Sequence, residues 1–226
     1  HAEGIVGGLP AQSWTMIASG AEELVFLPLG GAGEIGMNLN LYGWGPPGDR
    51  RWLMIDCGLG FNGNVVPGVD IVLPDPAYIA GQRGRLMGLV LTHAHEDHLG
   101  ALPYLWPQLR CPVYATRFTR AMMRHKLRDG GAMAELQPMA IPENGELQVG
   151  PFSLQLIGMT HSIPDAQAIV IRTPAATVLH TGDWKLDPEP VVGPTSDEVA
   201  LGSLGDAGVD ALVCDSTNGF APGRTG

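Results

Sequence analysis

Four residues with metal-ligating side chains fall within six consecutive positions of this chain: His93, His95, Asp97 and His98. Imidazole nitrogens and carboxylate oxygens are the donors that hold zinc in proteins, and manganese and iron accept them as well. His93 and His95 lie two residues apart, so in an extended segment their side chains leave the backbone on the same side and can bind one ion. Asp97 and His98 follow as the chain enters a helix expected over 99–105, where they could hold a second ion. The spacing therefore predicts a metal centre with a catalytic role.

Three apolar segments are expected to form the strands that position these ligands and two more. Residues 86–91 form an aliphatic run that ends directly before the histidine segment. Residues 152–159 alternate in polarity and lead to His161, and residues 177–180 lead to Asp183. His161 or Asp183 alone would be an ordinary turn residue. Because ligand types follow all three strands, we expect them to meet at one edge of a layered α/β fold.

This pattern resembles the metallo-β-lactamase superfamily and, within it, the β-CASP nucleases of the ribonuclease J type. The resemblance implies an α/β fold, the αββα sandwich, incomplete at its C-terminal end. It divides the chain into an extended or mobile arm over 1–23, the first part of the lactamase-like domain over 24–213, and the start of a β-CASP insertion over 214–226. The narrower resemblance rests on five motifs, at residues 29–38, 67–70, 161–165, 180–185 and 215–218.

The resemblance also assigns roles to individual residues. One divalent metal ion would be held by three histidines, His93, His95 and His161. The other would be held by Asp97 and His98, and Asp183 would bridge both ions. The residues expected to take part in catalysis are Asp97, His98 and Asp215. Zn²⁺ is the expected ion, with Mn²⁺ or Mg²⁺ as alternatives.

The implied activity is hydrolysis of RNA phosphodiester bonds, as an exonuclease, an endonuclease or both, by a hydroxide that two metal ions activate. RNA processing and decay, including that of ribosomal RNA, would be its setting, and the complete protein is expected to form homo-oligomers. The chain by itself is expected to be inactive or nearly so, because family histidines from later positions are absent. Two alternatives stay open: a small-substrate hydrolase of the thioesterase or lactamase type, and a scaffold without catalysis.

Composition predicts a single domain in the cytoplasm. The 226 residues are 45% hydrophobic, which is enough for a sizeable core, and they contain no apolar run long enough to span a membrane. The three cysteines are far apart and form no Cys-x-x-Cys pair, which favours a reduced, intracellular protein. The net charge of −10 opposes nucleic-acid binding over the general surface, although bound cations would reverse the charge at the site itself.

One segment departs from the acidic character of the chain. Arg117, Arg120, Arg124 and Arg128 recur at helical spacing, with Phe118, Ala121, Met122 and His125 expected toward another face. We interpret these arginines as the solvated face of an amphipathic helix, with an RNA-facing or interdomain surface as the alternative.

Four features near the expected ligands have other interpretations. Asp56 is assigned to a structural turn, with support of the metal ligands as the alternative. His180 is expected to support or pack beneath the site, and Glu96 to face solvent or form a supporting hydrogen bond. The segment 30–33 is rich in glycine but lacks the residues of a phosphate-binding loop, so it predicts no nucleotide cofactor.

Overall fold

The fold comes from a computed structural model, which describes residues 14–16, 22–61, 67–126, 135–142, 145–220 and 222, with only the backbone for 14–16. Most of the arm expected over 1–23 lies outside these residues. Its described part includes β1 (Trp14–Met16), a short strand that pairs antiparallel with β2.

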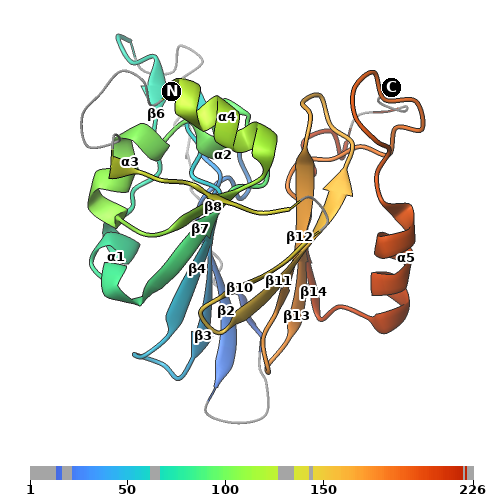
Figure 1. The fold of residues 1–226 in the computed structure, drawn as a ribbon. Coiled ribbons are helices and arrows are strands. Elements are labelled where there is room, and N and C mark those ends of the chain that lie inside the picture. Colours follow the sequence, from blue (N-terminus) through green and yellow to red (C-terminus); the bar gives the residue numbers. More distant parts are fainter. Residues whose placement is uncertain are drawn as a thin grey trace, which may run out of the picture.

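Two sheets lie face to face at the centre of the molecule, with helices on both outer faces (Figure 1). The first sheet has the order β1-β2-β3-β4-β7-β8-β9 and the second the order β10-β11-β12-β13-β14. The further strands of the first sheet are β2 (Glu23–Gly30), β3 (Leu39–Gly45), β4 (Arg51–Ile55), β7 (Leu86–Val90), β8 (Val113–Ala115) and β9 (Met139–Ala140). Those of the second are β10 (Glu146–Val149), β11 (Phe152–Met159), β12 (Ala166–Arg172), β13 (Thr177–His180) and β14 (Ala211–Val213).

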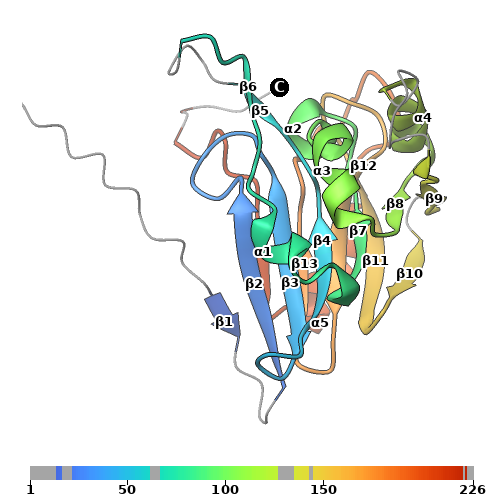
Figure 2. The same ribbon diagram turned by 90° about the vertical axis from the view of Figure 1, so that its left-hand side faces the viewer.

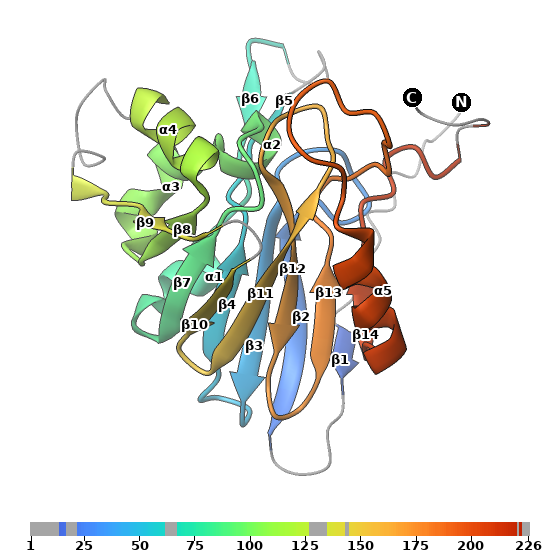
Figure 3. The same cartoon turned by 45° about the vertical axis from the view of Figure 1, so that its right-hand side comes forward.

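Helices cover both outer faces of this pair of sheets. Figure 2 looks onto the outer face of the first sheet, and Figure 3 shows α5 against the outer face of the second. The helices are α1 (Ala77–Ala80), the 3₁₀ turn η1 (Arg83–Arg85), α2 (Glu96–Leu99), α3 (Leu102–Leu109), α4 (Arg117–Lys126) and α5 (Glu198–Ala207). A two-stranded sheet of β5 (Gly60–Phe61) and β6 (Ile71–Val72) completes the described elements.

Alternate side chains of the central strands build the layers. In β4, Met54 packs into the core beneath the helices, while Leu53 and Ile55 pack into the core between the sheets. In β12, Ile169 points between the sheets and Val170 points toward α5. Because successive side chains of a strand alternate between faces, strands that are apolar throughout must be covered on both sides. The three cores account for the four layers of an αββα sandwich.

The three strands expected before the ligands are confirmed as β7, β11 and β13, the last two with the expected bounds. The single helix expected over 99–105 is wrong, because α2 ends at Leu99 and α3 begins at Leu102. Pro103 explains the break, since it has no N–H to donate to the carbonyl of residue 99 and its ring crowds that turn.

The arginine-rich helix is present as α4, and the part of the prediction that concerns Arg128 lies outside the described residues. Its apolar face is not entirely the expected one. Thr119 and Met123 are the buried residues of α4, whereas Ala121 and His125 are exposed. The helix is therefore rotated by part of a turn from the orientation that its hydrophobic residues predict.

Candidate metal centre

The loop after β7 brings the first histidines to the edge of the sandwich. Thr92 and His93 are buried there, and His95 has an extended backbone that serves as the N-cap position of α2. One turn of α2 then carries Asp97 and His98 back toward the same point. The loop and the first turn of α2 therefore place these closely spaced residues around a common centre.

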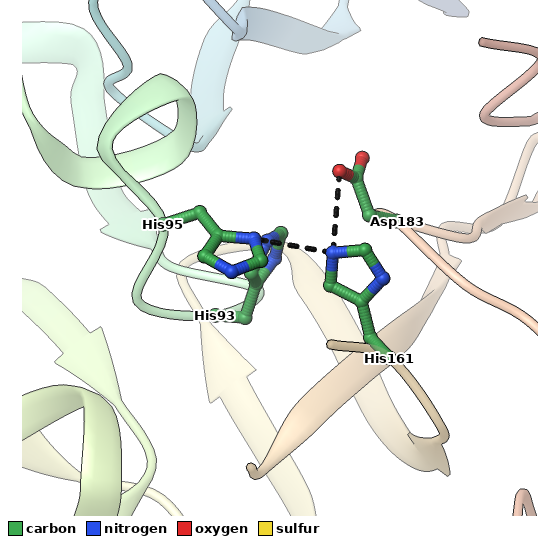
Figure 4. Close-up of side chains that lie close together, drawn as sticks. All are labelled: His93, His95, His161 and Asp183. Atoms are coloured by element: carbon green, nitrogen blue, oxygen red, sulfur yellow. Dashed lines mark hydrogen bonds and ion pairs between the residues drawn. The ribbon is translucent and has the colours of Figure 1, made fainter. Parts of the chain in front are cut away.

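The six residues expected as metal ligands converge in two groups that share Asp183. Ligand atoms of His93, His95, His161 and Asp183 all lie within 4.8 Å of one another, as do those of Asp97, His98 and Asp183. Figure 4 shows the first group, in which imidazole rings from the β7 loop and the end of β11 face each other beside the carboxylate.

Asp183 directs one oxygen toward each group. Its Oδ2 lies 3.6 Å from His161 Nε2, and its Oδ1 lies 3.2 Å from His98 Nε2. Asp97 Oδ2 lies 3.5 Å from the same nitrogen of His98. A carboxylate whose two oxygens face different donor sets can serve two cations at once.

The first group has the chemistry of a cation site. His95 Nδ1 lies 3.0 Å from His93 Nε2 and 3.1 Å from His161 Nε2. Burial lowers the pKa of all three histidines, and neighbouring imidazoles lower that of His93 further, so the rings are neutral at pH 7. Lone pairs of neutral imidazoles at such distances repel unless a proton or a cation lies between them. The donor set fits a divalent cation.

A buried network orients two of these rings. Asp56 is fully buried and accepts hydrogen bonds from Thr92 N–H (2.8 Å), from the Thr92 hydroxyl (2.9 Å) and from His98 Nδ1–H (2.7 Å). Since the Thr92 hydroxyl donates to Asp56, it accepts from His93 Nδ1–H at 3.0 Å. Both rings therefore present Nε2 to the centre, and outer partners of this kind raise the basicity of a metal ligand.

Asp56 consequently has the role that the sequence left as the alternative. The turn is also present, because its backbone adopts a left-handed φ of 64°, but the side chain supports His98 and the Thr92 loop. Burial lowers the pKa of His98, but the carboxylates of Asp56 and Asp183 outweigh burial and raise it to about 10. Protons and divalent cations thus compete for His98 Nε2.

The remaining expected residues lie around this centre. Asp215 lines a cavity together with Asp97 and Asp183, and its Oδ1 accepts hydrogen bonds from the backbone and hydroxyl of Thr217. Glu96, expected to face solvent or to form a supporting hydrogen bond, accepts a hydrogen bond from Lys126 within an ion pair. His180 is not in either ligand group and its Nδ1 contacts the Tyr42 hydroxyl at 2.9 Å, as expected for a residue beneath the site.

Two contacts at the centre have no counterpart among the expectations. Asn38 Nδ2–H donates to the Asp97 carbonyl (3.1 Å) and lies 3.2 Å from His98 Nε2. Gly58 packs so closely beneath α2 that a Cβ there would lie 1.5 Å from the Asp97 oxygen. Asn38 belongs to the motif at residues 29–38, on which the resemblance partly rests. Its neighbours in the sequence do not predict a contact with α2, some 60 positions later.

Comparison with known proteins agrees with this geometry. A family model described as the metallo-beta-lactamase superfamily matches residues 42–210. The chain belongs to the metallo-beta-lactamase superfamily. Its similarity to a solved structure of the same fold is consistent with this: a protein of unknown function from Enterococcus faecalis V583 superposes with a TM-score of 0.67 at 19% identity, over 91% of this chain and 52% of that one. The expected αββα metallo-β-lactamase sandwich is confirmed.

Relatives within the metallo-beta-lactamase superfamily include several proteins named Ribonuclease J. The one from Sinorhizobium meliloti is 54% identical over 202 residues, which are 89% of this chain and 36% of that protein. The one from Thermus thermophilus is 40% identical over 215 residues, which are 90% of this chain and 36% of that protein. The chain spans about a third of the length of these relatives.

Proposed function

We propose that the protein is a metal-dependent ribonuclease of the ribonuclease J type, which hydrolyses phosphodiester bonds of RNA at a centre of two divalent cations. The observation that carries the proposal is Asp183, whose two oxygens face two separate donor groups. The 54% identity to a Ribonuclease J over 89% of the chain supports RNA as the substrate.

The donor set favours zinc, since three imidazoles and a carboxylate suit that ion. His93, His95 and His161 would hold one cation, Asp97 and His98 would hold the other, and Asp183 would be shared by both. When bound, the cations lower the pKa of a water molecule from about 15.7 to near neutrality and offset negative charge on the phosphate.

The chain's own residues prepare this chemistry. The Asp56 carboxylate and the Thr92 hydroxyl hold His98 and His93 with Nε2 toward the centre, so that little reorganisation accompanies binding. Burial raises the pKa of Asp183, but the hydrogen bond and the positive charge of His98 outweigh burial and lower it, so the carboxylate is ionised at pH 7. We propose that Asp97 orients the attacking water. We propose that Asp215, which lines the same cavity, contacts the bound substrate.

The setting belongs to the same proposal. None of the described helices combines the length and apolar composition that a membrane crossing requires. All three cysteines are free thiols, two of them buried, which supports a reducing compartment and hence the cytoplasm. We propose homo-oligomers for the full-length protein, as in the resemblance above.

The test compares Asp183→Asn with Asp206→Asn, an exposed aspartate on α5, in the full-length protein. RNA, thioester and β-lactam substrates are offered with added Zn²⁺ or Mn²⁺. We expect the wild type to cleave RNA and neither of the other substrates. The rate of RNA cleavage should fall by more than about a hundredfold in Asp183→Asn and stay unchanged in the control. Hydrolysis of thioester or β-lactam with RNA left intact would establish the small-substrate alternative instead.

A further inference from the structure

A cavity of about 450 Å³ opens beside Asp97, His98 and Asp183 and extends toward Asp215. Four carboxylates line it, those of Glu34, Asp97, Asp183 and Asp215, and its described lining includes no lysine or arginine. Away from the cations that Asp97 and Asp183 would hold, a second phosphate would meet the carboxylates of Glu34 and Asp215 with no lysine or arginine of the described lining beside them. The cavity therefore suits a neutral part of a substrate whose scissile phosphate lies at the cations.

Two polar side chains form the buried floor of this cavity. Asn40, on β3, is 6% exposed, and His180, at the end of β13, is 5% exposed. Within the described part of the chain, the side-chain amide of Asn40 makes no hydrogen bond and the His180 ring makes one, through Nδ1. Neither the amide nor His180 Nε2 is among the atoms that are both buried and unpartnered. Both groups are therefore partly accessible, and their residues line the cavity.

The contact with Tyr42 determines which nitrogen of His180 carries the proton. Tyr42 is fully buried, and His180 Nδ1, at 2.9 Å, is the one hydrogen-bond partner of its hydroxyl among the described residues. A buried hydroxyl that did not donate would lose a hydrogen bond it makes in water, so it donates to Nδ1. Burial also lowers the pKa of His180 to about 4, which keeps the ring neutral. His180 thus presents Nε2–H to the cavity as a neutral donor.

A sugar hydroxyl is the neutral group that matches this floor. The O–H of the hydroxyl needs one acceptor, and its oxygen accepts at least one hydrogen bond. The side-chain amide of Asn40 supplies both an acceptor and a donor, and His180 Nε2–H supplies a second donor. The ribose 2′-hydroxyl is also the group by which a protein can distinguish RNA from DNA. Resting on the proposed function, we propose that Asn40 and His180 bind the 2′-hydroxyl of a nucleotide next to the scissile phosphate and so select RNA over DNA, with Tyr42 as the positioning residue.

The substrate-side test uses the full-length, metal-loaded wild-type protein, so it does not depend on the folding of any variant. Oligoribonucleotides carry a single 2′-deoxy nucleotide either before or after the cleaved bond. We expect kcat/KM to fall about tenfold for one of the two positions and to change little for the other, as the loss of one or two neutral hydrogen bonds in a closed site implies. Equal cleavage of the unmodified oligoribonucleotide and of both deoxy-substituted ones would overturn the inference, although the protein would still be a ribonuclease. Failure to cleave any RNA would remove the proposed function, and the inference with it.

The protein-side test uses Asn40→Ala and Tyr42→Phe. Asn40→Ala should slow the all-ribose substrate about tenfold and leave the deoxy substrate unchanged, so that discrimination disappears. Gln108→Ala and Tyr104→Phe, which change exposed side chains on α3, are the matched controls and should keep it. Equal slowing of both substrates in Asn40→Ala would mean a structural role and would contradict the inference.

Two further readouts separate positioning from folding. In ¹⁵N-histidine NMR spectra, His180 should be the Nε2–H tautomer in the wild type and a mixture in Tyr42→Phe. Calorimetry compares adenosine with 2′-deoxyadenosine monophosphates in two pairs, one phosphorylated at the 3′ position and one at the 5′ position. In one pair the ribonucleotide should bind the wild type more tightly, and both members of that pair should bind Asn40→Ala equally. Thermal unfolding of each variant identifies any that fails to fold, and equal affinity of the folded wild type within both pairs would count against the proposal.

Discussion

Replacing Asp56 by asparagine removes a carboxylate from the buried network that orients the rings of His93 and His98, while changing the side-chain volume little. The carboxylate accepts three hydrogen bonds, from Thr92 N–H, the Thr92 hydroxyl and His98 Nδ1–H. The asparagine amide keeps one oxygen and turns an NH₂ donor toward the donors of either Thr92 or His98. Losing a hydrogen bond to a charged acceptor and leaving a buried donor unpaired should cost about 3 kcal/mol of the free energy of unfolding. Because His98 loses its outer partner, zinc affinity should also fall about 10- to 100-fold.

Urea unfolding of the metal-free protein measures the first effect, and competition with a chromophoric zinc chelator measures the second. Asp206→Asn, on the exposed surface of α5, should change neither. An Asp56→Asn protein with wild-type stability and wild-type zinc affinity would refute the argument, because it would mean that the buried network neither stabilises the fold nor orients His98.

Three further predictions follow from the same contacts. In metal-free protein the pKa of His98 is raised from 6.5 to about 10. The stabilisation that protonated His98 contributes is therefore fully present below pH 6.5 and is lost as the pH rises through 10. The free energy of unfolding, measured at several pH values, should show this decline in the wild type and a smaller one in Asp56→Asn. Gly58→Ala should destabilise by at least about 3 kcal/mol or displace α2, because the new Cβ would lie 1.5 Å from the Asp97 carbonyl oxygen, whereas Gly84→Ala, with open space around it, should unfold like the wild type. His95→Ala should reduce bound zinc, as measured by plasma emission spectrometry, and His125→Ala, on the exposed face of α4, should not; equal zinc in both would exclude His95 from the centre.

Local patterns in the sequence were sufficient to predict the elements that deliver the ligands. The strands before His93, His161 and Asp183 are apolar runs of the right length, and each ends two or three residues before its predicted ligand. Periodicity and turn residues report on neighbours in the chain, and these are the features that such strands depend on. The convergence of three strand ends followed from the layered architecture that these patterns indicate.

Contacts between distant segments were beyond the reach of those patterns. Asp56 meets His98 across 42 positions, and Tyr42 meets His180 across 138. Asp56 follows a strand and adopts a turn, so its local signal is the same whether its side chain faces solvent or supports a ligand. Asn40 reads as one polar residue within an apolar strand, and only the packing of the two sheets places it on the floor of a cavity.

The central claim is that Asp183 joins two cation sites, and anomalous diffraction at the zinc absorption edge tests it most directly. Crystals of the zinc-loaded protein should give two anomalous peaks, one among His93, His95 and His161 and the other beside Asp97 and His98, with an oxygen of Asp183 next to each. A single peak, or peaks away from Asp183, would contradict the two-cation centre.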